Sequence, residues 1–325
     1  MMKKFILYYI GVFLCSLALS AHDFNFCIKG LDLAETKTTA FLYAHGLAST
    51  WVQGIEILWR HGILGRPRWI MDGPLAVFDF PDAKKEREYH NKEVNLAQEK
   101  DIDRLHAAYE RMCQLLPSHD IVLAGISRGA SAILNFAAVK QPKNIRALIA
   151  ESPFDTLSSV IKHMLIRFHV SWVPFSKHIG HKVCRKIFPG VNPKGMFPLN
   201  VVEKIPQDMP IMLVHSKKDR TVPINSSRRL YIKLRETGHE HVYLVELQSG
   251  NHGKLIFGPD ADFYTYVAHA FYKRYNIDHH PDFAHHGKHL LALCQPSIAD
   301  VSQRIQKKRQ IDDEEDYELE LVDDE

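Results

Sequence analysis

The chain has 325 residues, of which 46% are hydrophobic and 24% are charged, and its formal net charge is +3. This composition is ordinary for a globular protein, and the length suffices for one large α/β domain or two small ones. The sequence contains no Gly-rich phosphate-binding loop, and its basic run "KKR" is too short for a nucleic-acid-binding stripe. These absences argue against nucleotide and nucleic-acid binding.

The N-terminus has the pattern of a secretory signal peptide. "MMKK" supplies two lysines, residues 5–19 form an uncharged apolar run, and small residues follow. The run is short for a membrane span. We therefore expect residues 1–21 to be a signal peptide cleaved after Ser20 or Ala21, and the protein to be exported, either periplasmic or secreted. An uncleaved leader that anchors the chain in the membrane is the alternative.

Four cysteines remain beyond the leader, Cys27, Cys113, Cys184 and Cys294. An exported chain favours disulfides, but Cys113 also fits a buried position on a helix, so pairing stays open at this point. Four cysteines allow three connectivities, and their spacing does not choose among them. No C-x-x-C pair indicates a zinc or redox site.

Charge is distributed unevenly along the chain. The tail, residues 312–325, holds ten acidic residues and no basic one. Without this tail and the two leader lysines, the remaining body has a net charge of about +11. The basic body is compatible with peripheral contact at anionic surfaces. The tail is expected to be a solvated disordered segment; the alternatives are a tail that folds back on the basic surface and a C-terminal translocation signal.

Short apolar strand patterns alternate with longer helical patterns along the chain. This alternation predicts an α/β fold, with a mainly parallel sheet between helices on both faces. Strands are predicted at 38–46, 74–83, 120–127, 145–154, 209–216 and 241–250. Helices are predicted at 49–62, 101–116, 128–141, 225–238 and 261–275.

Two segments interrupt or follow this regular pattern. An insertion at about 155–208 is rich in aromatic, proline and basic residues, which suits a helical cap over a cleft; a larger crossover helix with a loop is the alternative. We expect residues 22–276 to form one domain that includes this cap. Residues 277–325 are His-rich and then acidic and are expected to form a disordered tail, with the chain beyond about 295 poorly ordered.

A serine stands between two glycines in "GISRG", where the predicted strand 120–127 meets the predicted helix 128–141. Ser127 at such a junction fits the G-x-S-x-G pattern of a nucleophile. A serine hydroxyl is a weak nucleophile unless a base takes its proton and an acid orients the base. Asp219 and His252 each follow a later predicted strand, so they project from the same edge of the sheet as Ser127. Glu151 or Asp155 could replace Asp219 as the acid.

The order Ser127, Asp219, His252 resembles that of the α/β-hydrolase superfamily. The resemblance extends from Thr38 to about Tyr275 and is carried by "YAHG", "GISRGA", "HSKKDRTVP" and "SGNHG". Within the superfamily, "ESPF" and "PIMLVHSKKDRTVP" resemble the prolyl oligopeptidase-like and small esterase branch. This likeness implies a serine hydrolase with an α/β-hydrolase fold.

The same resemblance implies an oxyanion hole formed by the backbone N–H groups of Leu47 and Arg128. His45 is expected to orient the loop that carries Leu47 rather than to act as the base. The side chain of Arg128 could meet a charged group of the substrate or pair with a structural acid, and the sequence favours neither.

The predicted activity is hydrolysis of a carboxylic ester through an acyl-enzyme, without a cofactor. The alternatives are a peptidase or acyl-amide hydrolase of prolyl oligopeptidase type, and a non-catalytic secreted binding or effector protein. The partner expected is a small-molecule ester or peptide substrate, and the oligomeric state is left open. His285 and His289 have helical i,i+4 spacing, but no acidic or cysteine ligand recurs beside them, so we predict no metal site.

Overall fold

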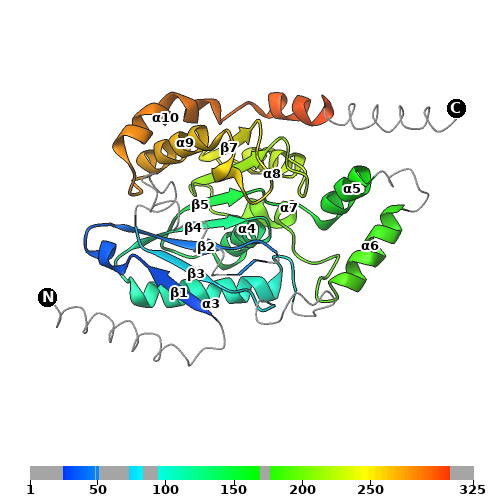
Figure 1. Cartoon of the computed structure of the whole chain (residues 1–325), viewed down its shortest axis with the longest axis horizontal. Helices are drawn as coiled ribbons and strands as arrows, with labels where there is room; N and C mark the ends of the chain where they lie inside the picture. The colour runs from blue at the N-terminus through cyan, green and yellow to red at the C-terminus, as the bar shows by residue number, and fades with distance from the viewer. Residues whose placement is uncertain (1–24, 48, 51–72, 83–93, 169–175, 308–325) are drawn as a thin grey trace.

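One sheet of seven strands organises the chain in the computed structural model, which describes residues 25–47, 49–50, 73–82, 94–168 and 176–307 (Figure 1). The strands are β1 (Phe26–Lys29), β2 (Thr39–Ala44), β3 (Leu75–Phe78), β4 (Asp120–Ile126), β5 (Ile145–Glu151), β6 (Ile211–Ser216) and β7 (Val242–Leu247). The predicted leader, most of the predicted helix 49–62 and the acidic tail lie outside these residues.

The strand order is β1-β3-β2-β4-β5-β6-β7. β1 pairs with β3 in antiparallel fashion, whereas all other neighbours are parallel, as in the pairing of Tyr43 with Ala124 and of Leu123 with Leu148. The alternation of strands and helices therefore predicted the six parallel strands, and the α/β fold class is confirmed. β1 was not predicted, because its four residues give too short a pattern.

Helices cover both faces of the sheet. They are α3 (Glu99–Leu115), α4 (Arg128–Lys140), α5 (Leu157–Arg167), α6 (Ser176–Ile187), α7 (Pro198–Val201), α8 (Asn225–Glu236), α9 (Ala261–Arg274) and α10 (Pro281–Leu293), with short 3₁₀ helices η1 (Leu31–Glu35), η2 (Val202–Lys204) and η3 (Leu255–Phe257). In β2, Leu42 points into the core beneath α3, α4 and α8, whereas Phe41 points into the core beneath α9 and α10. This alternation follows from the two-residue period of a strand.

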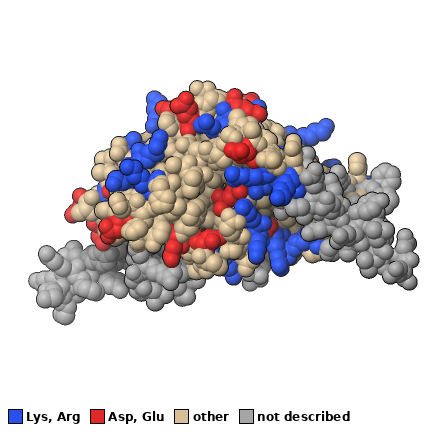
Figure 2. All heavy atoms as spheres, turned by 90° about the horizontal axis from the view of Figure 1, so that it is seen from above, with Lys and Arg blue, Asp and Glu red and all other residues tan. Residues whose placement is uncertain are grey.

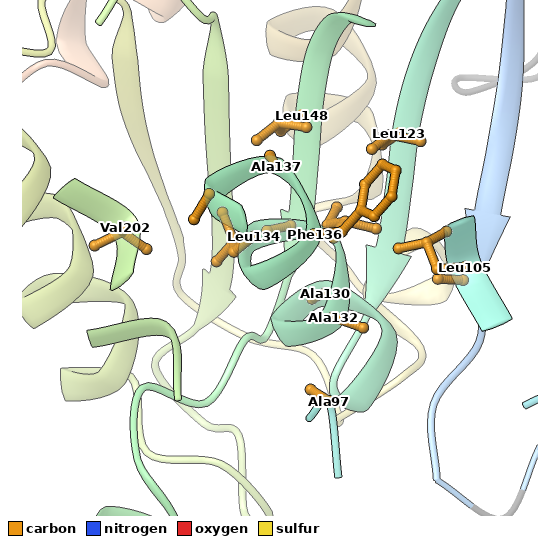
Figure 3. Close-up of a cluster of buried hydrophobic side chains, with 14 of the residues drawn as sticks. Ala97, Leu105, Leu123, Ala130, Ala132, Leu134, Phe136, Ala137, Leu148 and Val202 are labelled. Atoms are coloured by element: carbon orange, nitrogen blue, oxygen red, sulfur yellow. The ribbon is translucent and has the colours of Figure 1, made fainter. Parts of the chain in front are cut away.

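α4 is the central helix of the fold. From Arg128 to Ala138 every residue is buried. Figure 3 shows its side chains Leu134, Phe136 and Ala137 next to Leu123 and Leu148 of the sheet. Val202 of η2 lies on one side of α4 and Leu105 of α3 on the other. A helix that is apolar nearly all round belongs in a protein interior. The position of α4 fixes the residue that precedes it, Ser127.

The insertion predicted as a cap contains α5, α6, α7 and η2. In Figure 1, α5 and α6 project beyond one end of the sheet. α5 begins with a side-chain cap, in which the hydroxyl of Thr156 accepts the N–H of Ser159 at 3.2 Å. Ser158 of α5 and His181 of α6 form a side-chain hydrogen bond of 3.2 Å. No helix in the described part of the chain is long and apolar enough to cross a membrane.

The prediction of a disordered tail from residue 277, poorly ordered beyond about 295, is wrong as far as residue 307. α10 packs on α9, and a further helix follows at 298–307 (Figure 1). The backbone carbonyl oxygen of Cys294 accepts a hydrogen bond from the N–H of Leu244 at 2.7 Å. Arg304 forms an ion pair with Glu246 at 3.2 Å. This segment covers the outer edge of β7, which would otherwise expose unpaired backbone groups. The segment is mostly polar, and only a few apolar residues, such as the buried Val301, pack it against the domain. Its apolar pattern was therefore too weak to predict order.

All four described cysteines are free thiols. The open question of pairing is thus resolved against a disulfide among Cys27, Cys113, Cys184 and Cys294. Burial raises the pKa of Cys294 to about 12 and also raises the pKa of Cys184. These two side chains therefore stay protonated at neutral pH and serve as small packing residues.

A carboxyl group lies buried at the end of β5. Glu151 is only 7% exposed, and burial, with a further contribution from the charge of Asp219, raises its pKa to about 8. A hydrogen bond with Tyr264 of α9 partly offsets these effects. Glu151 is therefore mostly protonated in the folded protein at pH 7, whereas its ordinary pKa of 4.5 leaves it ionised in the unfolded chain.

We expect Glu151→Gln to change how stability depends on pH. The folded wild-type protein holds a proton that the unfolded chain releases above pH 4.5, so its unfolding free energy falls as pH rises toward 8. Gln does not titrate and removes this loss, which amounts to roughly 3 kcal/mol between pH 5 and pH 8. Urea unfolding at a series of pH values measures the difference. Glu99→Gln, at an exposed position of α3, is the control; parallel curves for wild type and Glu151→Gln would contradict the prediction.

Candidate active site

A cavity of about 710 Å³ lies where the carboxyl edge of the sheet meets the cap. Four of the five predicted site residues line it, namely Leu47, Ser127, Arg128 and His252. Apolar side chains of α5 and α6 line much of the rest, including Leu157, Val160, Met164, Val183, Ile187 and Phe188. An apolar cavity with a few polar groups on one wall is the usual form of a small-molecule site.

Ser127 occupies a sharp turn between β4 and α4. Its φ of 54° and ψ of −115° are unusual for a residue with a side chain, and such a conformation costs on the order of 1–3 kcal/mol. Two backbone hydrogen bonds hold it: Ser127 donates its N–H to the carbonyl of Glu151 at 2.8 Å and accepts the N–H of Ser131 at 3.0 Å. The turn directs the serine side chain out of the sheet edge and toward the cavity.

The two glycines of "GISRG" are required by close packing around this turn. A β-carbon on Gly129 would lie 2.0 Å from the carbonyl oxygen of Ala44 in β2. A β-carbon on Gly125 would lie 2.6 Å from the carbonyl carbon of Gly129 itself. Both distances are too short for any side chain. The glycines therefore let the start of α4 approach the strand ends closely, and this approach makes the turn at Ser127.

Asp219 and His252 form a direct pair. The Nδ1 of His252 lies 2.7 Å from the Oδ2 of Asp219. Asp219 follows β6 and His252 follows β7, so the ends of two neighbouring strands bring them together. Because Asp219 engages Nδ1, the imidazole presents Nε2 as its second nitrogen, and His252 lines the same cavity as Ser127.

Backbone N–H groups and histidine side chains hold the carboxylate of Asp219 in place. Its Oδ1 accepts the N–H groups of Thr221 at 2.8 Å and Val222 at 3.0 Å. Burial alone would raise the pKa of Asp219, but hydrogen bonds from His215 and His252 outweigh it and hold the pKa well below its ordinary value. Asp219 is therefore ionised at neutral pH, as a group that stabilises a protonated imidazole must be.

His215 was not predicted from the sequence, yet its side chain contacts this carboxylate and helps to hold it in place. Its Nε2 lies 3.4 Å from the Oδ2 of Asp219 and 3.0 Å from the carbonyl oxygen of Val222, and its Nδ1 lies 2.7 Å from the hydroxyl of Ser227. The ring is fully buried. His215 is the penultimate residue of the buried strand β6 and stands four residues before Asp219. This position in the sequence could have indicated a histidine close to Asp219.

The two alternative acids have other partners. Asp155 forms an ion pair with Arg229 at 2.5 Å and accepts hydrogen bonds from Ser226 and Ser159. Burial alone would raise its pKa, but these partners outweigh burial and lower it. Glu151 contacts Tyr264 and is mostly protonated. The structure thus pairs His252 with Asp219 rather than with either alternative.

The loop after β2 lies beside Ser127. A β-carbon on Gly46 would be 3.6 Å from the Cβ of Ser127, and the neighbouring Leu47 lines the cavity. His45 fixes this loop, since its Nδ1 lies 2.8 Å from the carbonyl oxygen of Gly46 and its Nε2 accepts the N–H of Phe80 at 3.4 Å. Burial is the main cause that lowers the pKa of His45, which keeps the ring neutral.

The side chain of Arg128 pairs with structural acids. Its Nε and Nη2 donate to the two carboxylate oxygens of Asp101 at 2.7 and 2.6 Å, and Nη2 also donates to Asp82 at 2.6 Å. The guanidinium stacks 4.4 Å from the centre of the Phe80 ring. Burial alone would lower the pKa of Arg128, but Asp101 and Asp82 outweigh it and keep the pKa above its ordinary value. Of the two roles left open by the sequence, the structure supports the ion pair with acids.

His285 and His289, the remaining candidates, are exposed on α10. Across the residues that the structure describes, no cluster of three or more His, Cys, Asp or Glu side chains is arranged to hold a metal ion.

The sequence and the fold were compared with those of known proteins. Residues 83–273 match the sequence profile of the prolyl oligopeptidase family, peptidase S9. A stretch of 136 residues, 41% of the chain, is 29% identical to the uncharacterized protein YqkD of Bacillus subtilis (strain 168) and covers 41% of it. The chain therefore spans about two fifths of the length of that relative.

Similar folds occur in several solved structures. The esterase Pf2001 of Pyrococcus furiosus has a TM-score of 0.54 at 18% identity, over 78% of this chain and 91% of the esterase. The acylaminoacyl peptidase of Pyrococcus horikoshii also has a TM-score of 0.54 at 18% identity, over 82% of this chain but only 44% of the peptidase. The monoacylglycerol lipase of Paleococcus ferrophilus has a TM-score of 0.50 at 16% identity, over 78% of this chain and 99% of the lipase. At these identities the likeness is one of fold.

The family profile covers more than half of the chain and includes the turn at Ser127 as well as Asp219 and His252. The chain therefore belongs to the prolyl oligopeptidase family, and it has an α/β-hydrolase fold.

Proposed function

We propose that the protein is an exported hydrolase that cleaves carboxylic esters with an apolar acyl group, using Ser127 as nucleophile, His252 as base and Asp219 as the acid that orients His252. The observation that carries the proposal is the apolar cavity of about 710 Å³ that Ser127 and His252 both line, with Asp219 hydrogen-bonded to His252 behind it. The basic and apolar leader pattern of residues 1–21 supports export.

In the first half of the reaction, the hydroxyl oxygen of Ser127 attacks the carbonyl carbon of the ester while Nε2 of His252 takes the hydroxyl proton. The imidazolium that forms is stabilised by the ionised Asp219 at 2.7 Å. His252 then gives the proton to the departing alkoxide, which leaves as an alcohol, and the acyl group remains bonded to the oxygen of Ser127 as an ester. In the second half, water attacks this acyl ester by the same steps, and the carboxylic acid leaves.

A negative charge develops on the carbonyl oxygen during the attack. We assign its stabilisation to hydrogen bonds from the backbone N–H groups of Arg128 and Leu47. Arg128 is the first residue of α4, and the N–H groups in the first turn of a helix have no partner within the helix. The positive end of the helix dipole further favours an anion at this position. The proximity of Gly46 to Ser127 supports the contribution of the neighbouring Leu47.

The apolar lining favours esters of apolar acids over peptides. Each CH₂ group that leaves water for such a surface contributes about 0.8 kcal/mol to binding, whereas peptide groups need hydrogen-bonding partners on the cavity wall. The second candidate, a peptidase or acyl-amide hydrolase, is supported by the family and by a structural neighbour, an acylaminoacyl peptidase solved with the inhibitor Z-Gly-Gly-Phe-chloromethyl ketone. The remaining alternative is a non-catalytic binding or effector protein.

Covalent labelling tests the proposed nucleophile. A fluorophosphonate probe should label the wild-type protein, and Ser127→Ala should abolish labelling because Ser127 is the proposed nucleophile in the cavity that His252 also lines. His252→Gln and Asp219→Asn should each lower kcat by about 10⁴-fold or more. Gel fluorescence of the labelled protein and ester hydrolysis rates provide the measurements.

Ser49→Ala is the matched control, because Ser49 lines the same cavity. It should leave labelling unchanged. Labelling that survives Ser127→Ala would rule out the proposed nucleophile, and a wild-type protein that the probe does not label would favour the non-catalytic alternative.

Rates on a series of esters test the proposed substrate class. For p-nitrophenyl esters, kcat/KM should rise with acyl length up to the size that the cavity holds, by at most about fourfold per CH₂. Val160→Trp fills part of the cavity and should lower kcat/KM for long esters more than for the acetate.

Val139→Trp, at an exposed position of α4 outside the cavity, is the control. It should leave kcat/KM unchanged both for long esters and for the acetate. Retained acetate hydrolysis shows that each variant is folded. Aminoacyl p-nitroanilides that are cleaved faster than every ester would instead assign the protein as an amide hydrolase.

A further inference from the structure

The cap carries a strong and one-sided charge. Between Asp155 and Glu203 the chain has no acidic residue, whereas it has seven basic ones: Lys162, Arg167, Lys177, Lys182, Arg185, Lys186 and Lys194. In Figure 2, which views another face of the molecule, Lys and Arg also gather right of centre, toward the end at which α5 and α6 lie. A surface with this excess of positive charge attracts partners of negative charge.

The outer surfaces of α5 and α6 combine this charge with exposed apolar side chains. Lys182, Arg185 and Lys186 of α6 are all exposed. On the same helix, Ile179 is 51% exposed and Val183 is 49% exposed, and Phe168 at the end of α5 is 64% exposed. Large apolar side chains are normally exposed singly. Here three of them lie on two helices that contact each other, among basic residues.

The exposed apolar side chains adjoin the proposed substrate cavity. Val183 and Phe168 are half-exposed or more and yet line the same cavity as Ser127. The cavity therefore has an apolar rim at the surface of the cap. The lining of this one cavity includes the rim, apolar side chains of α5 and α6, and Ser127.

The cap is firmly attached to the domain beneath it. Asp155, just before α5, pairs with Arg229 of α8 and is buried. Arg167, at the end of α5, donates to the carbonyl oxygen of Arg220 at 2.9 Å. Ser158 and His181 join α5 to α6. These contacts therefore hold the basic and apolar groups of α5 and α6 together on one surface of the protein.

We propose that the outer surface of α5 and α6 docks on a membrane of anionic phospholipids, from which an acyl-ester substrate passes over the rim into the cavity. Basic side chains attract anionic headgroups, and exposed apolar side chains of an amphipathic helix insert at the boundary of the acyl chains. The exposed apolar side chains distinguish a lipid surface from a purely electrostatic partner. Docking itself is independent of the proposed hydrolysis, whereas entry of the substrate rests on it.

The test compares binding of the full chain to vesicles of phosphatidylcholine alone and of phosphatidylcholine with phosphatidylglycerol, by cosedimentation. Binding to the anionic vesicles should be the stronger. The triple variant Lys182→Gln, Arg185→Gln, Lys186→Gln should lose on the order of 100-fold in affinity for them, and Ile179→Ser should weaken binding further at high salt. All variants keep the same N-terminus, so the apolar leader contributes equally to each.

The matched control is Lys143→Gln, Lys273→Gln, Lys288→Gln, which removes the same charge at exposed positions on other elements. It should lose far less affinity. Equal loss in both triple variants would overturn the proposal in favour of diffuse attraction. Binding that begins only after removal of residues 308–325 would overturn it in favour of the chain's own acidic tail as the occupant. Ser127→Ala should bind like wild type, which separates docking from hydrolysis.

Discussion

The proposed chemistry depends on one steric constraint, the contact between the start of α4 and the carboxyl ends of β2 and β4. Gly129 lies against the carbonyl oxygen of Ala44 so closely that no side chain fits. Because α4 is buried along most of its length, it cannot move away to relieve the backbone of Ser127. Core packing therefore holds the strained turn, and the same contact sets the N-terminus of α4 opposite the loop of Gly46. The proposed nucleophile and the proposed oxyanion donors are therefore positioned by the same packing contact.

Buried charges perform a second positioning task. Arg128 and Asp101 join the start of α4 to the start of α3, and Asp155 and Arg229 join the base of the cap to α8. Such pairs contribute little net stability, because burial removes both charges from water. Breaking one partner is costly, about 3–5 kcal/mol, because the other charge is left buried alone. These pairs therefore act mainly to select one arrangement of the loops around the cavity, which an apolar contact would define less sharply.

The sequence predicted the parts of the molecule that local patterns determine. The six parallel strands follow from apolar runs, and the pairing of Asp219 with His252 follows from their positions after successive strands. Features that depend on distant contacts were not predictable in this way. The partners of Arg128 lie 27 and 46 residues away, and the role of His215 depends on Ser227 and Val222. The ordered segment to residue 307 was missed because a polar sequence is stabilised by a few contacts with β7.

The covering of β7 by the C-terminal segment has a consequence for folding kinetics. Asp278 accepts hydrogen bonds from Thr38 and Thr39, about 240 residues earlier, and Cys294 pairs with the edge of the last strand. Contacts with such long sequence separation form slowly, since the closure of a large loop precedes the energy gained from it. The sheet therefore remains open at one side until nearly the whole chain has been synthesised. A nascent chain in this state lacks its final tertiary structure, because the contacts that close the sheet come from its last residues to be made.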